Sequence, residues 1–189
     1  MAAAEVDRRL ADRRWWAISP RDACPDNCAL RPDGSGTLFD FEGGGARHAL
    51  LDAAYLVSTF PTCWCTGDLP AKSRTAGLAA YRNAAAWSLD DFDRHLAAAA
   101  AFHGLWVLNS FRFPAALADE GGARRHLAEV GFDLPSARQV VALAIDDLDR
   151  ATHSDRNIAA LGDLARSLRS ALAERWGSWE RPPPHPAFL

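Results

Sequence analysis

From residue 48 almost to the end of the chain, apolar side chains recur at helical spacing, and this pattern constrains the fold most. Apolar residues three and four positions apart share one face of an α-helix and are buried together there. The pattern predicts helices over residues 49–57, 70–86, 88–109 and 135–151, then a last helix that Asp155 caps. That last helix should bury one stripe, Ile158, Leu161, Leu164, Leu168 and Leu172. With a further helix expected over residues 3–16, the chain should be mainly α.

Residues 29–40 carry the β-pattern of the sequence. Two short arms, residues 29–31 and 37–39, flank residues 32–36, a run of proline, aspartate, glycine and serine that favours turns. The segment predicts one small β-hairpin. A single hairpin is not the sheet of a doubly wound α/β protein, so that class is excluded.

Composition and charge limit the function. The net charge of −3 lacks the basic surplus typical of a nucleic-acid binder, and a hydrophobic content of 49% suffices for a core. No apolar run approaches the roughly 20 residues that span a bilayer, and the charged N-terminus resembles no secretion signal. We expect one cytoplasmic domain over residues 1–181, an extended proline-rich tail over 182–189, and neither nucleic-acid nor membrane partners.

Four cysteines are expected to be free thiols in a reducing compartment. They are spaced as C-x3-C and, much later, C-x-C: Cys24, Cys28, Cys63 and Cys65. Four thiolates also suit zinc, but neither pair has the usual C-x2-C spacing, so buried cysteines are the preferred interpretation.

The chemistry of the chain is concentrated before and after the hairpin. Asp22 and Asn27 lie five residues apart on a loop that Pro25 stiffens, and Asp40 follows the second arm. Because antiparallel arms return to their starting point, Asn27 and Asp40 should meet, and their hard oxygens suit Mg²⁺. Asp22 could then accept a proton from an incoming hydroxyl, as phosphoryl transfer requires. Alternatively, Asp22 and Asn27 are plain turn residues.

Residues 19–56 resemble the aminoglycoside phosphotransferase and choline kinase-like family. Members carry His-Gly-Asp-x-x-x-x-Asn, a hairpin, Ile-Asp-Phe/Trp-Glu and a helix with Asp-Leu-Ala; this chain has Asp22, Pro25, Asn27, Asp40-Phe41-Glu42 and Asp52-Ala53-Ala54. The resemblance implies the C-terminal lobe of the protein-kinase-like fold, with ATP as donor and a small-molecule hydroxyl as acceptor. It also implies that Asp22 is the catalytic base, that Asn27 and Asp40 bind Mg²⁺, and that Asp52 supports the catalytic loop.

Two departures accompany this resemblance. Pro20-Arg21 stands in place of the family's His-Gly, whose histidine orients the loop. The residues before Asp22 read as one helix without glycine or lysine, so we expect the N-terminal ATP-binding lobe to be absent. The chain should then be incomplete alone and should use a separate lobe or self-association. The alternative is a non-catalytic kinase-like helical module that binds a ligand or a partner protein.

Most of the remaining conspicuous residues are expected to have structural roles only. Lys72 follows the catalytic loop and should be a solvated surface residue. Trp64 is a candidate for lining a substrate pocket. The acids at positions 146, 147 and 149 should form a solvated helix face, and Trp87 and Trp106 should lie in the core.

Overall fold

The computed structural model describes residues 1–58, 63, 67–85, 89–123, 125–127 and 132–184. Helices dominate it, so the prediction of a mainly α chain is confirmed. The longer helices are α1 (Ala2–Leu10), α4 (Ala71–Ala85), α5 (Leu89–Leu108), α7 (Ala137–His153) and α8 (Ala159–Trp176). The shorter ones are α2 (Leu50–Ala53), α3 (Tyr55–Ser58) and α6 (Arg112–Leu117), and the 3₁₀ turns are η1 (Arg13–Trp15), η2 (Pro25–Asn27), η3 (Asp119–Gly122) and η4 (Arg156–Ile158).

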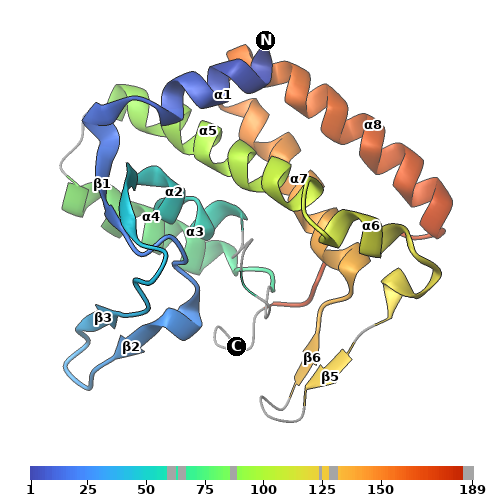
Figure 1. Ribbon diagram of the computed structural model, residues 1–189, viewed down its shortest axis with the longest axis horizontal. Coiled ribbons are helices and arrows are strands. Elements are labelled where there is room, and N and C mark those ends of the chain that lie inside the picture. The colour runs from blue at the N-terminus through green and yellow to red at the C-terminus, as the bar shows by residue number, and fades with distance from the viewer. Residues whose placement is uncertain (59–62, 64–66, 86–88, 124, 128–131, 185–189) are drawn as a thin grey trace.

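The core lies between α5, α7 and α8, with α1 packed across them (Figure 1). Five successive alanines, residues 97–101, give α5 a buried surface of small side chains against its neighbours. Gly104 permits a close approach of α5 to α7, because a Cβ there would lie 3.1 Å from the Leu148 Cβ of α7. A buried ion pair between Arg9 and Asp155 joins α1 to the start of η4, and Asp155 also caps η4 through the backbone N–H of Asn157. Asp155 thus caps the 3₁₀ turn that leads into the last helix, whereas α8 itself has Ile158 at its N-cap.

The first 19 residues differ from the expected single helix over 3–16. Helix α1 ends at Leu10, Asp12 caps η1, and the chain then continues as strand β1 (Trp16–Ser19). A tertiary contact and a local preference together explain why the helix ends early. Trp15 is drawn into the core, where it stacks on His95 at 4.5 Å, and the aromatic and branched residues after it favour a strand.

Three two-stranded antiparallel pairs are present in the described residues, so the prediction of one hairpin was wrong. The expected hairpin is there as β2 (Cys28–Leu30) and β3 (Gly36–Leu38), with Ala29 opposite Thr37. Strand β1 pairs with β4 (Gly45–His48), and β5 (Arg125–Leu127) pairs with β6 (Phe132–Leu134). Both extra pairs use strands of three or four residues, too short for a periodic signal.

Helix positions were predicted better than burial. The expected helix over 135–151 begins at Ala137, because Ser136 is the N-cap, and the helices near 70–86 and 88–109 are present. Ser88 and Trp87 lie outside the described residues. Leu164 and Trp106 are largely exposed, which corrects the predicted stripe and core, whereas the exposed Lys72 is as expected.

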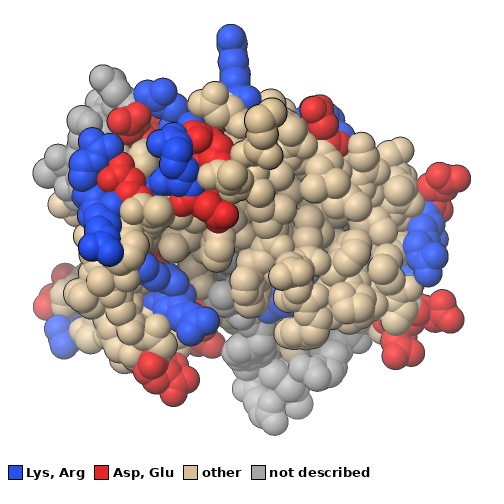
Figure 2. Space-filling view, turned by 45° about the horizontal axis from the view of Figure 1, so that its top comes forward, with Lys and Arg blue, Asp and Glu red and all other residues tan. Residues whose placement is uncertain are grey.

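The surface carries charges of both signs. Figure 2 shows basic and acidic side chains intermixed at one end of the face it presents, beside a broad uncharged area. Paired neighbours such as Arg14–Asp12 at 2.6 Å and Arg94–Asp91 at 2.9 Å account for such mixing. Part of the tail packs on its own domain, where the Asp68 N–H donates to the Pro183 carbonyl at 2.9 Å. Among the described helices, none is long and apolar enough to cross a membrane.

His103 of α5 is buried in the helical core. Its ring meets the Tyr55 ring edge-on at 5.0 Å, and its Nδ1 has no hydrogen-bond partner among the described residues. Burial lowers the pKa of His103 from 6.5 to about 3, because the charged ring would lose its hydration. His103 is therefore a neutral core residue.

This burial predicts that stability falls with acidification. Between pH 6.5 and 3 the unfolded chain binds a proton at His103 that the folded chain refuses, so the stabilisation is complete above pH 6.5 and is lost as pH falls. His103 should account for about 2 kcal/mol of the loss between pH 7 and pH 5. Urea denaturation should show that the free energy of unfolding depends less on pH in His103→Leu than in the parent. The substitution His153→Leu, at an exposed histidine, should leave the pH dependence of the parent unchanged. Equal pH dependence in His103→Leu and the parent would contradict the assignment.

Candidate functional site

Two nested strand pairs build the site. The outer pair, β1–β4, places Ser19 opposite Gly45, and the inner pair, β2–β3, places Cys28 opposite Leu38. The two connecting segments, residues 20–27 and 39–44, are thereby held at the same junction between the two pairs. They contain three of the residues expected from the sequence: Asp22, Asn27 and Asp40.

Asp22 and Asn27 are joined within the first segment. The Asn27 side-chain Nδ2 donates to the Asp22 carbonyl at 3.1 Å, and the Asn27 backbone N–H donates to the Cys24 carbonyl at 2.9 Å. Pro25 is the first residue of η2. A backbone N–H at that position would have no partner within the helix, so proline, which has none, fits there. The bond through Nδ2 directs the amide nitrogen of Asn27 into the loop and leaves its carbonyl oxygen as the group able to accept.

The hairpin brings the residue before Asp40 into contact with Asn27. The Phe39 N–H donates to the Asn27 carbonyl at 3.1 Å, so Asp40 directly follows a residue bonded across the hairpin base. The second segment also approaches β1 closely: a Cβ at Gly44 would lie 3.1 Å from the Ser19 carbonyl oxygen. Glycine is needed there, and it lets the two segments touch.

Backbone strain is concentrated at this junction. Of the described residues other than glycine, only Arg21 (φ 77°) and Asp40 (φ 60°) adopt a positive φ. Such a conformation is uncommon for residues with a Cβ and persists only where surrounding contacts determine it. One strained residue immediately precedes Asp22, and the other is Asp40 itself.

Asp52 contacts the residues around the first segment through side chains. Its Oδ1 accepts from the Ser19 hydroxyl and from the Arg47 guanidinium, both at 2.7 Å, and its side chain is 17% exposed. Ser19 in turn accepts from the Arg21 N–H at 3.1 Å and from the Arg47 Nε at 2.6 Å. Arg47 also donates to the Arg21 carbonyl at 2.9 Å. Ser19, Arg47 and Asp52 thus form a polar cluster around Arg21.

Tyr55 adds a fourth group that the sequence analysis missed. Its hydroxyl lies 3.2 Å from the Arg21 carbonyl oxygen and 3.4 Å from the Asp22 Oδ1. A signal for Tyr55 was available, since it follows Asp52 by three residues and helical spacing puts them on one side. Ser19 and Arg47 carried no such signal, because they meet only through the pairing of β1 with β4.

The cysteines depart from the expected free thiols. Cys24 and Cys63 form a disulfide with their Cα atoms 5.7 Å apart, whereas Cys28 is a free thiol and Cys65 lies outside the described residues. Asp26 lies beside this pair, with its ligand atom and the two sulfurs all within 4.8 Å of one another. Because the disulfide engages both sulfurs, the trio offers no thiolate to zinc. The bond ties the segment holding Asp22 to the chain beyond α3.

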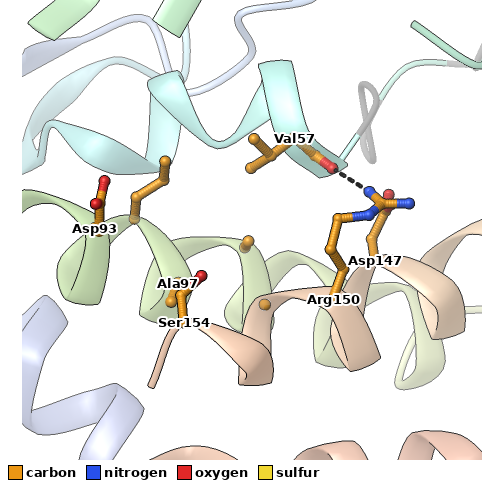
Figure 3. Close-up of a pocket in the computed structure, with 9 residues that line it drawn as sticks. Val57, Asp93, Ala97, Asp147, Arg150 and Ser154 are labelled. Atoms are coloured by element: carbon orange, nitrogen blue, oxygen red, sulfur yellow. Dashed lines mark hydrogen bonds and ion pairs between the residues drawn. The ribbon is translucent and has the colours of Figure 1, made fainter. Parts of the chain in front are cut away.

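A separate hollow of about 120 Å³ lies between α3, α5 and α7 (Figure 3). Asp147 and Arg150 stand together at one end of it, joined at 2.6 Å, and Asp93 stands at the other. Asp147 is buried, and burial raises its pKa to about 7 against the opposing effect of Arg150. The expectation that the acids at 146, 147 and 149 form a solvated face was therefore wrong for Asp147. The cause is its position on the side of α7 that faces the core. Trp64, the expected pocket residue, lies outside the described residues.

Comparison with known proteins adds no assignment: no protein-family model matches the sequence, and no curated protein matches it significantly.

The polar cluster predicts that Asp52→Ala destabilises the protein. The substitution leaves Arg47 and the buried Ser19 hydroxyl without their shared acceptor, which should lower the free energy of unfolding by about 1–2 kcal/mol. Urea denaturation would measure the change. Asp93→Ala is the matched control, because it removes an exposed pair with Arg82 of similar length, 2.8 Å, and should cost less than about 0.5 kcal/mol. Equal losses in the two variants would contradict a structural role for Asp52.

Proposed function

We propose that the chain is the catalytic-loop lobe of a kinase-like phosphotransferase, which moves the γ-phosphate of ATP to a hydroxyl of a small molecule. In this proposal Asp22 accepts the proton of the acceptor hydroxyl as its oxygen attacks the phosphoryl group. Asn27 and Asp40 would hold Mg²⁺, which neutralises charge on the phosphates when bound. Asp52 supports the loop without touching the reactants.

One observation carries the proposal: the strained backbone falls on the segments that the chemistry needs. Arg21 and Asp40 are far apart in sequence, yet Arg21 directly precedes the expected base Asp22, and Asp40 is an expected metal ligand. Residues held in sparsely populated conformations cluster at active sites, where the fold fixes reacting groups against their local preference. A pair of plain turns would have no need for a buried polar cluster around Arg21.

The donor set fits magnesium. The atoms of Asn27 and Asp40 able to bind a cation are oxygens, and the Asn27 nitrogen is bonded to the Asp22 carbonyl. Mg²⁺ prefers oxygen ligands and usually binds one or two protein groups together with substrate phosphates. Both residues remain accessible, since Asp40 is exposed and Asn27 is half-buried.

The groups that grip ATP would come from outside these 189 residues. Residues 1–19 form α1, η1 and β1, which supply neither a glycine-rich strand pair nor a lysine. The surface beside the site is apolar in the way a docked lobe requires: Ile18 is 75% and Leu30 79% exposed, and Trp16, Leu38 and Phe39 are also exposed.

The first test concerns the metal. Mn²⁺, a paramagnetic substitute for Mg²⁺, should broaden NMR signals of residues 22–28 and 39–44 in the full chain. Asp40→Asn should weaken this binding by about tenfold or more, because a charged oxygen ligand is lost. The control is Asp33→Asn, at the far end of the same hairpin, which should bind Mn²⁺ as the parent does. Equal weakening by both variants, or broadening centred elsewhere, would contradict the metal assignment.

The second test concerns turnover. The purified chain alone should not turn over ATP at a useful rate, since positioning supplies most of phosphoryl-transfer catalysis. Adding a β-sheet lobe with a glycine-rich strand pair should restore activity, and Asp22→Asn should abolish it. Robust turnover by the chain alone would disprove the need for a second lobe. Activity that survives Asp22→Asn would disprove the catalytic role, and partner binding without any turnover would favour the non-catalytic module.

A further inference from the structure

The Arg21 carbonyl oxygen and the Asp22 side chain both lie within hydrogen-bonding distance of one hydroxyl, that of Tyr55. We infer that Tyr55, on α3, is a positioning residue for Asp22: its hydroxyl orients the Asp22 carboxylate. The inference rests on the proposed function for its catalytic meaning and on the contacts below for its geometry.

Tyr55 is itself held rigidly. Its side chain is among the largest fully buried ones, with 2% of its surface exposed. The ring packs edge-on against the buried His103 with the planes at 88°. A phenol has few rotatable bonds, so a ring fixed in this way also fixes where its hydroxyl oxygen lies. The hydroxyl is thus a defined point from which to orient the loop.

The hydroxyl faces two acceptors that compete for its one proton. The Arg21 carbonyl at 3.2 Å already receives the Arg47 guanidinium at 2.9 Å, whereas the Asp22 Oδ1 lies at 3.4 Å from the same hydroxyl. A hydroxyl has a single donor, and bonds to an ionised acceptor are stronger than bonds to a neutral one. Donation to Asp22 is therefore favoured when its carboxylate is charged, the form that a general base must have.

The same contacts make the orientation specific. The Arg21 N–H donates to Ser19 and the Arg21 carbonyl accepts from Arg47, so the peptide that leads into Asp22 cannot rotate freely. The Asn27 side chain fixes the Asp22 carbonyl at the other end of the residue. With the backbone held at both ends, donation from the Tyr55 hydroxyl favours the side-chain rotamer of Asp22 that keeps its Oδ1 within reach.

The test uses the two tyrosines of the chain as probe and control. In the full chain labelled with ¹³Cζ-tyrosine, Asp22→Asn should shift the Tyr55 resonance, because the charged acceptor is replaced by a neutral one. Tyr81, whose hydroxyl donates to the Ala49 carbonyl at 2.8 Å, should not shift. A merely structural Tyr55 would not respond to the charge of Asp22. An unchanged Tyr55 resonance would overturn the inference.

A kinetic arm separates this inference from the proposed function. With the chain and an added β-sheet lobe in excess over Mg-ATP, single-turnover hydrolysis should slow about tenfold in Tyr55→Phe at unchanged nucleotide affinity, the effect of losing one hydrogen bond to a charged group. Tyr81→Phe is the matched control and should keep the parent rate. Equal slowing in both variants would overturn the positioning role. No hydrolysis by the parent in the presence of a β-sheet lobe would count against the proposed function, and the NMR measurement would still decide the role of Tyr55.

Discussion

The buried hydroxyl of Ser19 is the contact on which the arrangement of the site depends. Its one donor and both acceptor positions are used, by Asp52, the Arg21 N–H and Arg47. These bonds join β1, β4 and α2. In a buried environment such a cluster is stable only when complete, because each unpaired member would cost the energy of its lost hydration. The cluster therefore specifies one geometry for the chain that enters Asp22.

Strain and close approach are two consequences of that geometry. Holding Arg21 in a left-handed conformation turns the chain sharply after β1, and the returning segment passes close enough that Gly44 has no room for a side chain. Asp40 then adopts the second left-handed conformation at the base of the hairpin. Each distortion opposes local preference, and each is stabilised by contacts made elsewhere. The two segments are consequently fixed relative to each other before any ligand arrives.

Features that depend on residues close in sequence could be predicted, whereas features that depend on contacts between distant residues could not. The long helices, the hairpin around Ala29 and Thr37, and the spacing of Asp22 and Asn27 are local patterns, and the structure contains them. The pairing of β1 with β4 and the Cys24–Cys63 bond join distant positions, the latter 39 residues apart, and no short-range pattern specifies them. The role of Asp52 was predicted, but its partners were not, because Ser19 and Arg47 become neighbours only after the strands pair. The burial of Asp147 likewise depends on which side of α7 meets the core.

The exposed apolar surface and the strained loop point to the same conclusion about how the chain works. Ile18 and Leu30 leave large apolar areas in water, and this costs free energy that a covering partner would recover, at about 25 cal/mol per Å². The left-handed Arg21 and Asp40 cost further stability within the isolated chain. A module selected only for stability would lose both features through polar or glycine substitutions at these positions. Both features lie on the strands and loops that hold Asp22 and Asp40, which fits the proposed function of a lobe that meets a second body at this edge.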